Sequence, residues 1–184
     1  MNEPITILLV DDHEVVRNGV RAYLETQPDI RVVGEAATGE EGIKLVAETI
    51  PDIVLLDLIM PGMDGVETTR HIKEISPRTH VVVLTSYHKD VHIFPALRAG
   101  AISYILKDIK MEQLADTIRR TIKGEVVLHP RVASRVLQNI RGDHDEEREQ
   151  REDRHVGKVA GVDEAVVVCA GEHPLGDLER TAAG

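Results

Sequence analysis

Carboxylates directly follow apolar runs at two places in the first third of the chain. Asp11 and Asp12 follow the run ITILLV, and Asp57 follows IVLL. Burying an unpaired charge is costly, so we expect these carboxylates to lie exposed at the rim of a sheet, not buried in it. Carboxylates crowded at one rim repel each other, and a divalent cation relieves that repulsion. Mg²⁺ fits such a site, because it usually takes one or two carboxylates plus phosphate oxygens and keeps several waters.

A hydroxyl and an ammonium occupy equivalent positions on two later runs. Thr85 ends HVVVLT, and Lys107 follows ISYIL. These groups can contact the oxygens of a phosphoryl group, so the set predicts phosphoryl transfer to an aspartate, aided by metal and lysine. Taken singly, each residue is better explained as an ordinary polar group at a strand end, and the aspartate pair as a helix cap. Five such residues on four strands favour the functional interpretation.

Strands and helices alternate five times over the first 125 residues, which positions these groups. Short β-branched strands separated by amphipathic helices indicate right-handed βα units, hence an α/β fold with a parallel sheet and helices on both faces. The crevice of such a sheet lies at the carboxyl ends of its strands. The expected strands are Ile5–Val10, Ile30–Ala37, Ile53–Leu56, His80–Thr85 and Ile102–Leu106. The expected helices are Glu14–Thr26, Gly39–Thr49, Val66–Ile75, Val91–Ala99 and Met111–Lys123.

Composition narrows the class of protein. Aromatic residues make up 2% of the 184 residues and tryptophan is absent, so the core must be aliphatic. Cys169 is the single cysteine, which excludes a disulfide framework and a cysteine metal site. No apolar run approaches the roughly 18 residues of a membrane span, and the N-terminus lacks the basic start of a signal peptide. We therefore expect a cytoplasmic protein that does not contact membranes.

Four motifs carry a resemblance to a known family. LLVDDHEVVRNGV, LLDLIMPGMDG, VVLTSY and YILKD, in this order and spacing, resemble the receiver domain of two-component response regulators over about residues 4–125. The resemblance implies a five-stranded, doubly wound, flavodoxin-like sheet. It also implies that Asp57 accepts a phosphoryl group from a sensor histidine kinase. Asp12 and Asp57 would bind Mg²⁺, Asp11 would act through water, and the Ile59 carbonyl would complete the protein's share of the coordination.

The resemblance also implies a switch. Thr85 and Lys107 would contact the phosphoryl group, and Tyr104 would change rotamer on activation. The face formed by residues 91–99, 102–106 and 111–123 commonly forms the signalling surface or a homodimer on phosphorylation. Many family members have proline after the lysine, whereas Asp108 stands here, so no cis-proline turn is expected. His13 follows the aspartate pair, and we assign it to a helix start rather than to the site.

The chain after residue 125 resembles only part of a longer pattern. GEVVLHPRVASRVLQNIR is similar to the linker of NarL/LuxR-type regulators, where a helix-turn-helix DNA-binding domain follows. We expect a receiver at 1–125, a linker helix at 126–142, and an acidic tail at 143–184 that is disordered or weakly structured. Residues 141–184 hold 6 Lys and Arg against 12 Asp and Glu, which opposes phosphate contacts and makes DNA binding by this chain doubtful. A natural acidic extension and a reading frame lost near residue 142 both remain open.

Three functions remain in competition. A phosphorylation switch that controls transcription is the leading hypothesis, with a stand-alone or truncated receiver without DNA-binding output as its alternative. An aspartyl-phosphate phosphatase needs a second acid two residues after the nucleophile, where Ile59 stands, so we do not expect an enzyme. A flavin or nucleotide binder needs a loop rich in Gly, Ser or Thr, and DDHEVV is not one.

Overall fold

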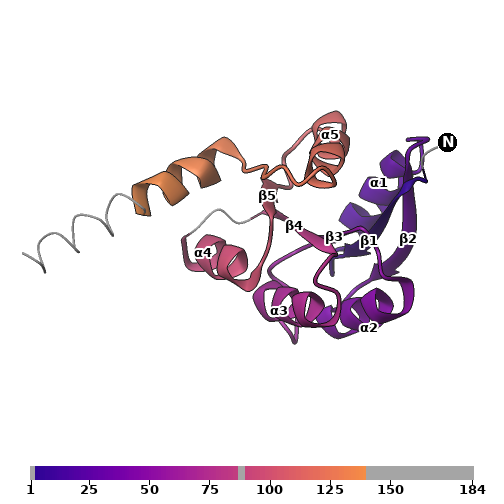
Figure 1. Cartoon of the computed structure of the whole chain (residues 1–184), viewed down its shortest axis with the longest axis horizontal. Coiled ribbons are helices and arrows are strands. Elements are labelled where there is room, and N and C mark those ends of the chain that lie inside the picture. Colours follow the sequence, from indigo (N-terminus) through magenta and orange to yellow (C-terminus); the bar gives the residue numbers. More distant parts are fainter. Residues whose placement is uncertain (1–2, 87–89, 140–184) are drawn as a thin grey trace, which may run out of the picture. The chain divides into compact units, whose positions relative to one another are not determined.

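A parallel sheet forms the centre of the fold (Figure 1). The computed structural model describes residues 3–86 and 90–139. Tyr87 of the VVLTSY motif and the expected tail at 143–184 therefore lie outside the described residues. The strands are β1 (Ile5–Val10), β2 (Ile30–Ala36), β3 (Ile53–Leu56), β4 (His80–Thr85) and β5 (Ser103–Leu106).

The order of the strands places β1 and β3 at the turning point of the chain path. The order is β2-β1-β3-β4-β5, and every neighbouring pair is parallel. The chain runs from β1 outward to β2 and then returns to place β3 on the other side of β1. In open α/β sheets the functional crevice lies where the strand order reverses. The predicted five-stranded, doubly wound α/β fold is confirmed.

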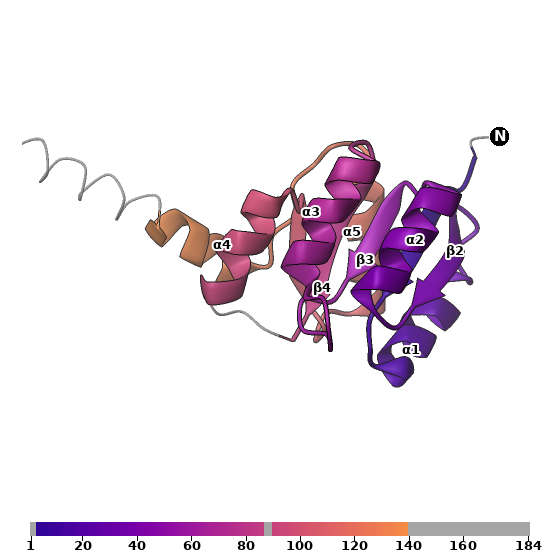
Figure 2. The ribbon, with the colours of Figure 1, turned by 90° about the horizontal axis from the view of Figure 1, so that it is seen from below.

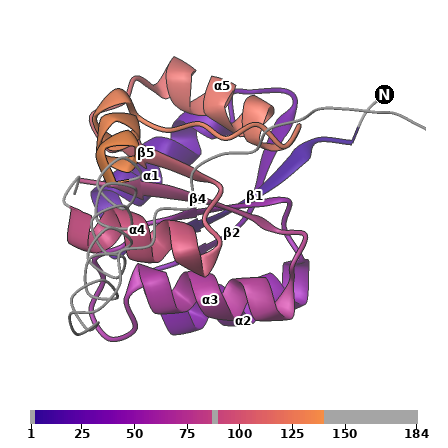
Figure 3. The same ribbon diagram turned by 60° about the vertical axis from the view of Figure 1, so that its left-hand side comes forward.

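Helices cover both faces of the sheet because alternate strand residues point to opposite sides. Leu8 and Val10 join the core shared with α2, α3 and α4, whereas Ile7 and Leu9 join the core shared with α1 and α5. Figure 2 shows α2, α3 and α4 in front of the sheet, and Figure 3 shows α5 and α1 on the opposite side from α2 and α3. The bounds are α1 (Glu14–Leu24), α2 (Gly39–Thr49), α3 (Gly65–Ile75), α4 (Asp90–Ala99) and α5 (Met111–Thr121).

Two helices end two residues earlier than their apolar periodicity predicts. α1 ends at Leu24 rather than Thr26, and α5 at Thr121 rather than Lys123. The amides of Thr26 and Lys123 donate to carbonyls three residues back, which tightens each last turn away from α-helical geometry. The apolar periodicity of the sequence continues through such a turn, so it cannot mark the residue at which the helix ends.

The segment after α5 packs against the edge strand β5. The Tyr104 amide donates to the Val127 carbonyl at 2.9 Å, and the His129 amide donates to the Tyr104 carbonyl at 2.8 Å. A helix over residues 130–139 follows, and its Val132 is fully buried in the core cluster that contains Tyr104 and Ile93 of α4. The start of the expected linker is thus part of the hydrogen bonding and packing of the sheet domain. No helix in the described ranges is long and apolar enough to cross a membrane.

Candidate functional site

The carboxylates that follow β1 and β3 meet at the point where the strand order reverses. Val10 pairs with Leu56, so the next residue of each strand lies at the same level of the sheet. The Asp57 amide donates to the Val10 carbonyl at 2.9 Å, which fixes this level. The sequence prediction that Asp11 and Asp57 lie near each other follows directly from this register.

Asp57 is buried, with 3% of its surface exposed, and Asp11 is 6% exposed. The expectation that these carboxylates are exposed at the rim is therefore wrong. The physical reason is local compensation: Asp57 Oδ1 accepts from the Leu58 amide at 2.7 Å, and its Oδ2 accepts from Lys107 Nζ at 2.7 Å. Charge-assisted hydrogen bonds of this kind make a buried carboxylate tolerable.

Lys107 lies between the two carboxylates. Its Nζ is 2.7 Å from Asp11 Oδ2 as well as from Asp57 Oδ2, and its side chain is largely buried. Its amide donates to the Thr85 carbonyl, which holds it against the end of β4. Burial lowers the pKa of the Lys107 ammonium, but hydrogen bonds and charges from both aspartates outweigh burial, so the net pKa is raised. Lys107 is therefore held in its charged form.

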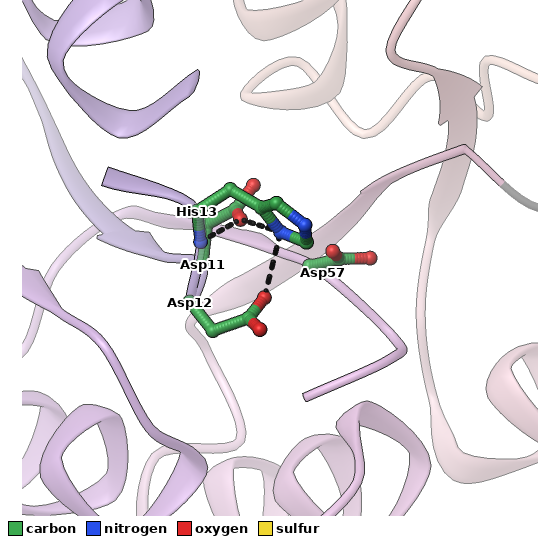
Figure 4. A group of neighbouring side chains, drawn as sticks. All are labelled: Asp11, Asp12, His13 and Asp57. Atoms are coloured by element: carbon green, nitrogen blue, oxygen red, sulfur yellow. Dashed lines mark hydrogen bonds and ion pairs between the residues drawn. The ribbon is translucent and has the colours of Figure 1, made fainter. Parts of the chain in front are cut away.

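A set of possible metal-ligand atoms surrounds the same point (Figure 4). One ligand atom each from Asp11, Asp12, His13 and Asp57 lies within 4.8 Å of all the others. Asp12 Oδ1 is buried and accepts no hydrogen bond among the described residues. Three carboxylates against one lysine leave an excess of negative charge. A divalent cation fits this donor set, because it would neutralise that charge and bind the Asp12 oxygen that accepts no hydrogen bond.

Thr85 lies at the end of β4, and Tyr104 lies within β5. Both side chains are fully buried, and Tyr104 belongs to the core on the α2–α4 side. Burial raises the pKa of the Tyr104 phenol well above its ordinary value, and the nearby Asp57 charge adds to the rise. The Tyr104 side chain thus lies in the electrostatic reach of Asp57. Ile59 is half-buried, with its amide nitrogen 3.4 Å from Asp57 Oδ1, and its role as a carbonyl ligand stays a prediction.

The loop between β3 and α3 turns back against the backbone of Asp57. Gly62 has φ of 81°, a left-handed conformation that suits glycine, and Asp64 caps α3 by accepting from the Glu67 amide. The Gly65 amide donates to the Leu58 carbonyl at 2.9 Å. A Cβ at Gly65 would lie 2.4 Å from the Asp57 carbonyl oxygen and 2.6 Å from Leu58 Cα. Only glycine lets the start of α3 approach the Asp57 backbone this closely.

Gly65→Ala is expected to lower the free energy of unfolding by about 2 kcal/mol, because the methyl group meets backbone that must shift. Gly19→Ala in α1 is the matched control: nothing lies within 4 Å of its Cβ, so the better helix propensity of alanine should stabilise slightly. Urea unfolding of both variants measures the difference. Equal stabilities for the two variants would contradict the close approach at Gly65.

His13 is a neighbour of the site that its sequence position alone does not assign to it. His13 is the N-cap residue of α1, as predicted, but its side chain makes no capping hydrogen bond. Instead, His13 Nδ1 lies 2.8 Å from Asp12 Oδ1 and 3.3 Å from Asp11 Oδ1. Its position directly after the aspartate pair was the signal available in the sequence. Among the described residues no peptide bond is cis, so the bond between Lys107 and Asp108 is trans.

The doubly wound sheet with acidic groups and a lysine at its switch point defines a domain of the receiver class. The chain belongs to the family described as the response regulator receiver domain, which matches it over residues 7–119. The match starts in β1 and ends in α5, so it contains all the residues of the candidate site.

Two relatives support the assignment of the chain to this family. The chain is 48% identical to the transcriptional regulatory protein LiaR of Bacillus subtilis over 137 residues, 74% of this chain and 65% of LiaR. It is 46% identical to the response regulator protein VraR of Staphylococcus aureus over 128 residues, 70% of this chain and 61% of VraR. The chain thus spans less than two thirds of the length of these relatives.

Solved structures give the same fold. A LuxR-family two-component response regulator from Aurantimonas sp. SI85-9A1 is 34% identical with a TM-score of 0.70, covering 74% of this chain and 98% of that one. The receiver domain of the putative response regulator NarL from Mycobacterium tuberculosis is 30% identical with a TM-score of 0.65, covering 67% and 100%. The resemblance to LuxR-type response regulators is confirmed.

Proposed function

We propose that the chain is a phosphorylation-operated switch in which Asp57 accepts a phosphoryl group from a sensor histidine kinase. The observation that carries the proposal is the position of Asp57: a buried carboxylate 2.7 Å from the Lys107 ammonium, inside a group of three carboxylates. We also place the protein in the cytoplasm, where a kinase of a two-component system transfers its phosphoryl group.

Different residues of the site have different roles in the proposed phosphoryl transfer. The carboxylate of Asp57 attacks phosphorus, the new O–P bond forms, and the P–N bond to the donor's histidine breaks. Asp11, Asp12 and Asp57, with the carbonyl of Ile59, would hold Mg²⁺, which supplies positive charge for the phosphoryl oxygens when bound. The Lys107 ammonium already contacts Asp57 Oδ2 and can exchange that contact for a phosphoryl oxygen.

The switch has a route from the site to the linker. Thr85 lies at the end of β4, where its hydroxyl can turn toward a new dianionic group, and Tyr104 lies on the neighbouring strand. Both backbone polar groups of Tyr104 are bonded to residues 127 and 129. A conformational change at Tyr104 would therefore be transmitted to the helix over residues 130–139. We propose this α4–β5–α5 side, with the linker on it, as the output surface for a homodimer or another partner.

Val132→Ala tests whether the linker is held by that packing. The loss of a fully buried valine should weaken linker docking by about 2 kcal/mol, so the amides of Tyr104 and His129 should exchange with deuterium roughly 10- to 30-fold faster. Leu137→Ala on the same helix is the control, since Leu137 is 56% exposed. Unchanged exchange in Val132→Ala would show that the linker is not held through this residue.

Transcription regulation is the output we propose, because LiaR is named a transcriptional regulatory protein. The alternative is a receiver without DNA-binding output of its own, favoured by the acidic composition of residues 141–184, which leaves DNA binding doubtful. A phosphatase is the less favoured enzyme, since Ile59 offers no acid for the leaving group.

Incubation with radiolabelled acetyl phosphate and Mg²⁺ separates these functions. The switch predicts stable labelling that approaches one phosphoryl group per chain, with slow release of inorganic phosphate. Continuous phosphate release at many turnovers per chain would support the phosphatase instead. An absence of both labelling and turnover would overturn the proposed function.

A further inference from the structure

The Arg17 side chain of α1 contacts the backbone of the residue that follows β1. Its Nη1 donates to the Asp11 carbonyl oxygen at 2.6 Å, and the side chain is only 16% exposed. On the other side of the same residue, the Asp11 amide continues the sheet hydrogen bonds by donating to the Ala36 carbonyl at 3.1 Å. Arg17 therefore satisfies a backbone carbonyl that lies beyond the end of β1.

Glu35 of β2 holds the other side of the Arg17 guanidinium. Its Oε2 lies 3.5 Å from Arg17 Nε, and its Oε1 accepts from Nη1 of Arg21, which lies one turn further along α1. Arg17 Nε is buried and donates no hydrogen bond among the described residues, so its contact with Glu35 is an ion pair. The planar guanidinium thus reaches a carboxylate and a backbone carbonyl at once, which the single nitrogen of a lysine cannot do in the same way.

The carbonyl that Arg17 holds belongs to the peptide that joins Asp11 to Asp12. Because a peptide unit is planar, fixing its carbonyl also fixes the direction in which the Asp12 backbone continues. The Asp11 carboxylate has further support from Lys107 Nζ and from the His13 amide. Asp12 Oδ1 accepts no hydrogen bond among the described residues, so the orientation of this carboxylate rests mainly on its backbone.

We propose that Arg17 is a positioning residue for phosphoryl transfer, which holds the Asp11–Asp12 peptide and with it both carboxylates in the arrangement that a cation needs. The inference rests on the proposed function, since it concerns the Mg²⁺ that these carboxylates would hold. Arg17 has no acceptor atom and cannot bind the ion itself. Its positive charge alone would oppose the binding of a cation, so the two effects of removing Arg17 differ in sign. Loss of positioning weakens Mg²⁺ binding, whereas loss of charge strengthens it.

Arg17→Met and Arg21→Met on the full chain test this by calorimetric titration of the unphosphorylated protein with Mg²⁺. Both variants lose a positive charge and a contact with Glu35, but only Arg17→Met loses the hydrogen bond to Asp11. Arg17→Met should bind Mg²⁺ about tenfold more weakly than wild type, and Arg21→Met should stay within about twofold of it. Urea unfolding of both variants checks that they are folded.

The rate of labelling by acetyl phosphate distinguishes positioning from a general loss of structure. In Arg17→Met the Mg²⁺ concentration that gives half the maximal rate should rise about tenfold. The rate at saturating Mg²⁺ should stay within about threefold of wild type, because the bound ion restores the arrangement of the carboxylates. Arg17→Lys keeps the charge but has one donor nitrogen, so it should bind Mg²⁺ at least about threefold more weakly, and it replaces Arg17→Met if that variant does not fold.

Three results would count against the inference. Unchanged or tighter Mg²⁺ binding in Arg17→Met, or in Arg17→Lys where it replaces that variant, would overturn it while leaving Mg²⁺-dependent labelling of the wild type intact. An equal loss of Mg²⁺ affinity in Arg21→Met would overturn it in the same way, because Arg21 does not contact Asp11. Wild-type protein that neither binds Mg²⁺ nor takes up label would overturn the inference and the proposed function together.

Discussion

Asp57→Asn is expected to reduce labelling by acetyl phosphate by about a thousandfold or more. The carboxylate oxygen is the nucleophile, and a carboxamide of the same shape cannot replace it. The rate of label incorporation with saturating Mg²⁺ measures the effect. The variant should stay folded, since the carboxamide oxygen can still accept from the Leu58 amide and Lys107 keeps its contact with Asp11.

Asp108→Asn is the matched control for this variant. Asp108 is an exposed carboxylate that directly follows Lys107, so it lies at the same rim but outside the group of metal-ligand candidates. Its labelling rate should stay within about twofold of wild type. Substantial labelling of Asp57→Asn, or an equal loss in Asp108→Asn, would contradict the assignment of Asp57 as the acceptor.

Lys107→Met is expected to lower the free energy of unfolding by about 3 kcal/mol. Methionine keeps much of the apolar stem but removes the ammonium, which leaves the buried Asp11 and Asp57 carboxylates facing each other without a counter-charge. Urea unfolding at neutral pH in the presence of a chelator measures the loss. Lys44→Met on the exposed side of α2 is the control and should change stability by less than about 0.5 kcal/mol.

Either of two changes, added Mg²⁺ or a second substitution, should restore stability to Lys107→Met for the same electrostatic reason. Millimolar Mg²⁺ supplies the missing positive charge and stabilises the folded state by binding to it. A second substitution, Asp57→Asn, removes one of the two repelling anions. The double variant should therefore be more stable than Lys107→Met alone, and a strictly additive result would show that Lys107 and Asp57 are not coupled.

The sheet and the approximate position of the site could be predicted because both follow from local pattern. Apolar runs such as Ile53–Leu56 identify strands, and parallel strands bring their carboxyl ends to one edge. That is sufficient to place Asp11 near Asp57 without any knowledge of side-chain contacts. The registers Val10–Leu56 and Leu56–Val83 then explain why the neighbouring strand ends lie level.

Other features depend on contacts distant in sequence. The burial of Asp57 requires Lys107, fifty residues away, to reach its carboxylate. The docking of residues 127–129 on Tyr104 requires β5 to be an edge strand of the sheet, which no periodicity after residue 125 reveals. The position of His13 in the sequence predicts only a helix start, whereas its ring contacts depend on the loop between β1 and α1.

We expect the phosphoryl group to be carried by Asp57 itself. Borohydride reduction of acetyl phosphate-treated protein converts a phosphorylated aspartate to homoserine, which peptide mass spectrometry locates in the chain. Homoserine should appear at position 57 alone, and none should form when Mg²⁺ is chelated before treatment. Homoserine at position 11 or 12, or unmodified aspartate at position 57 in labelled protein, would contradict this expectation.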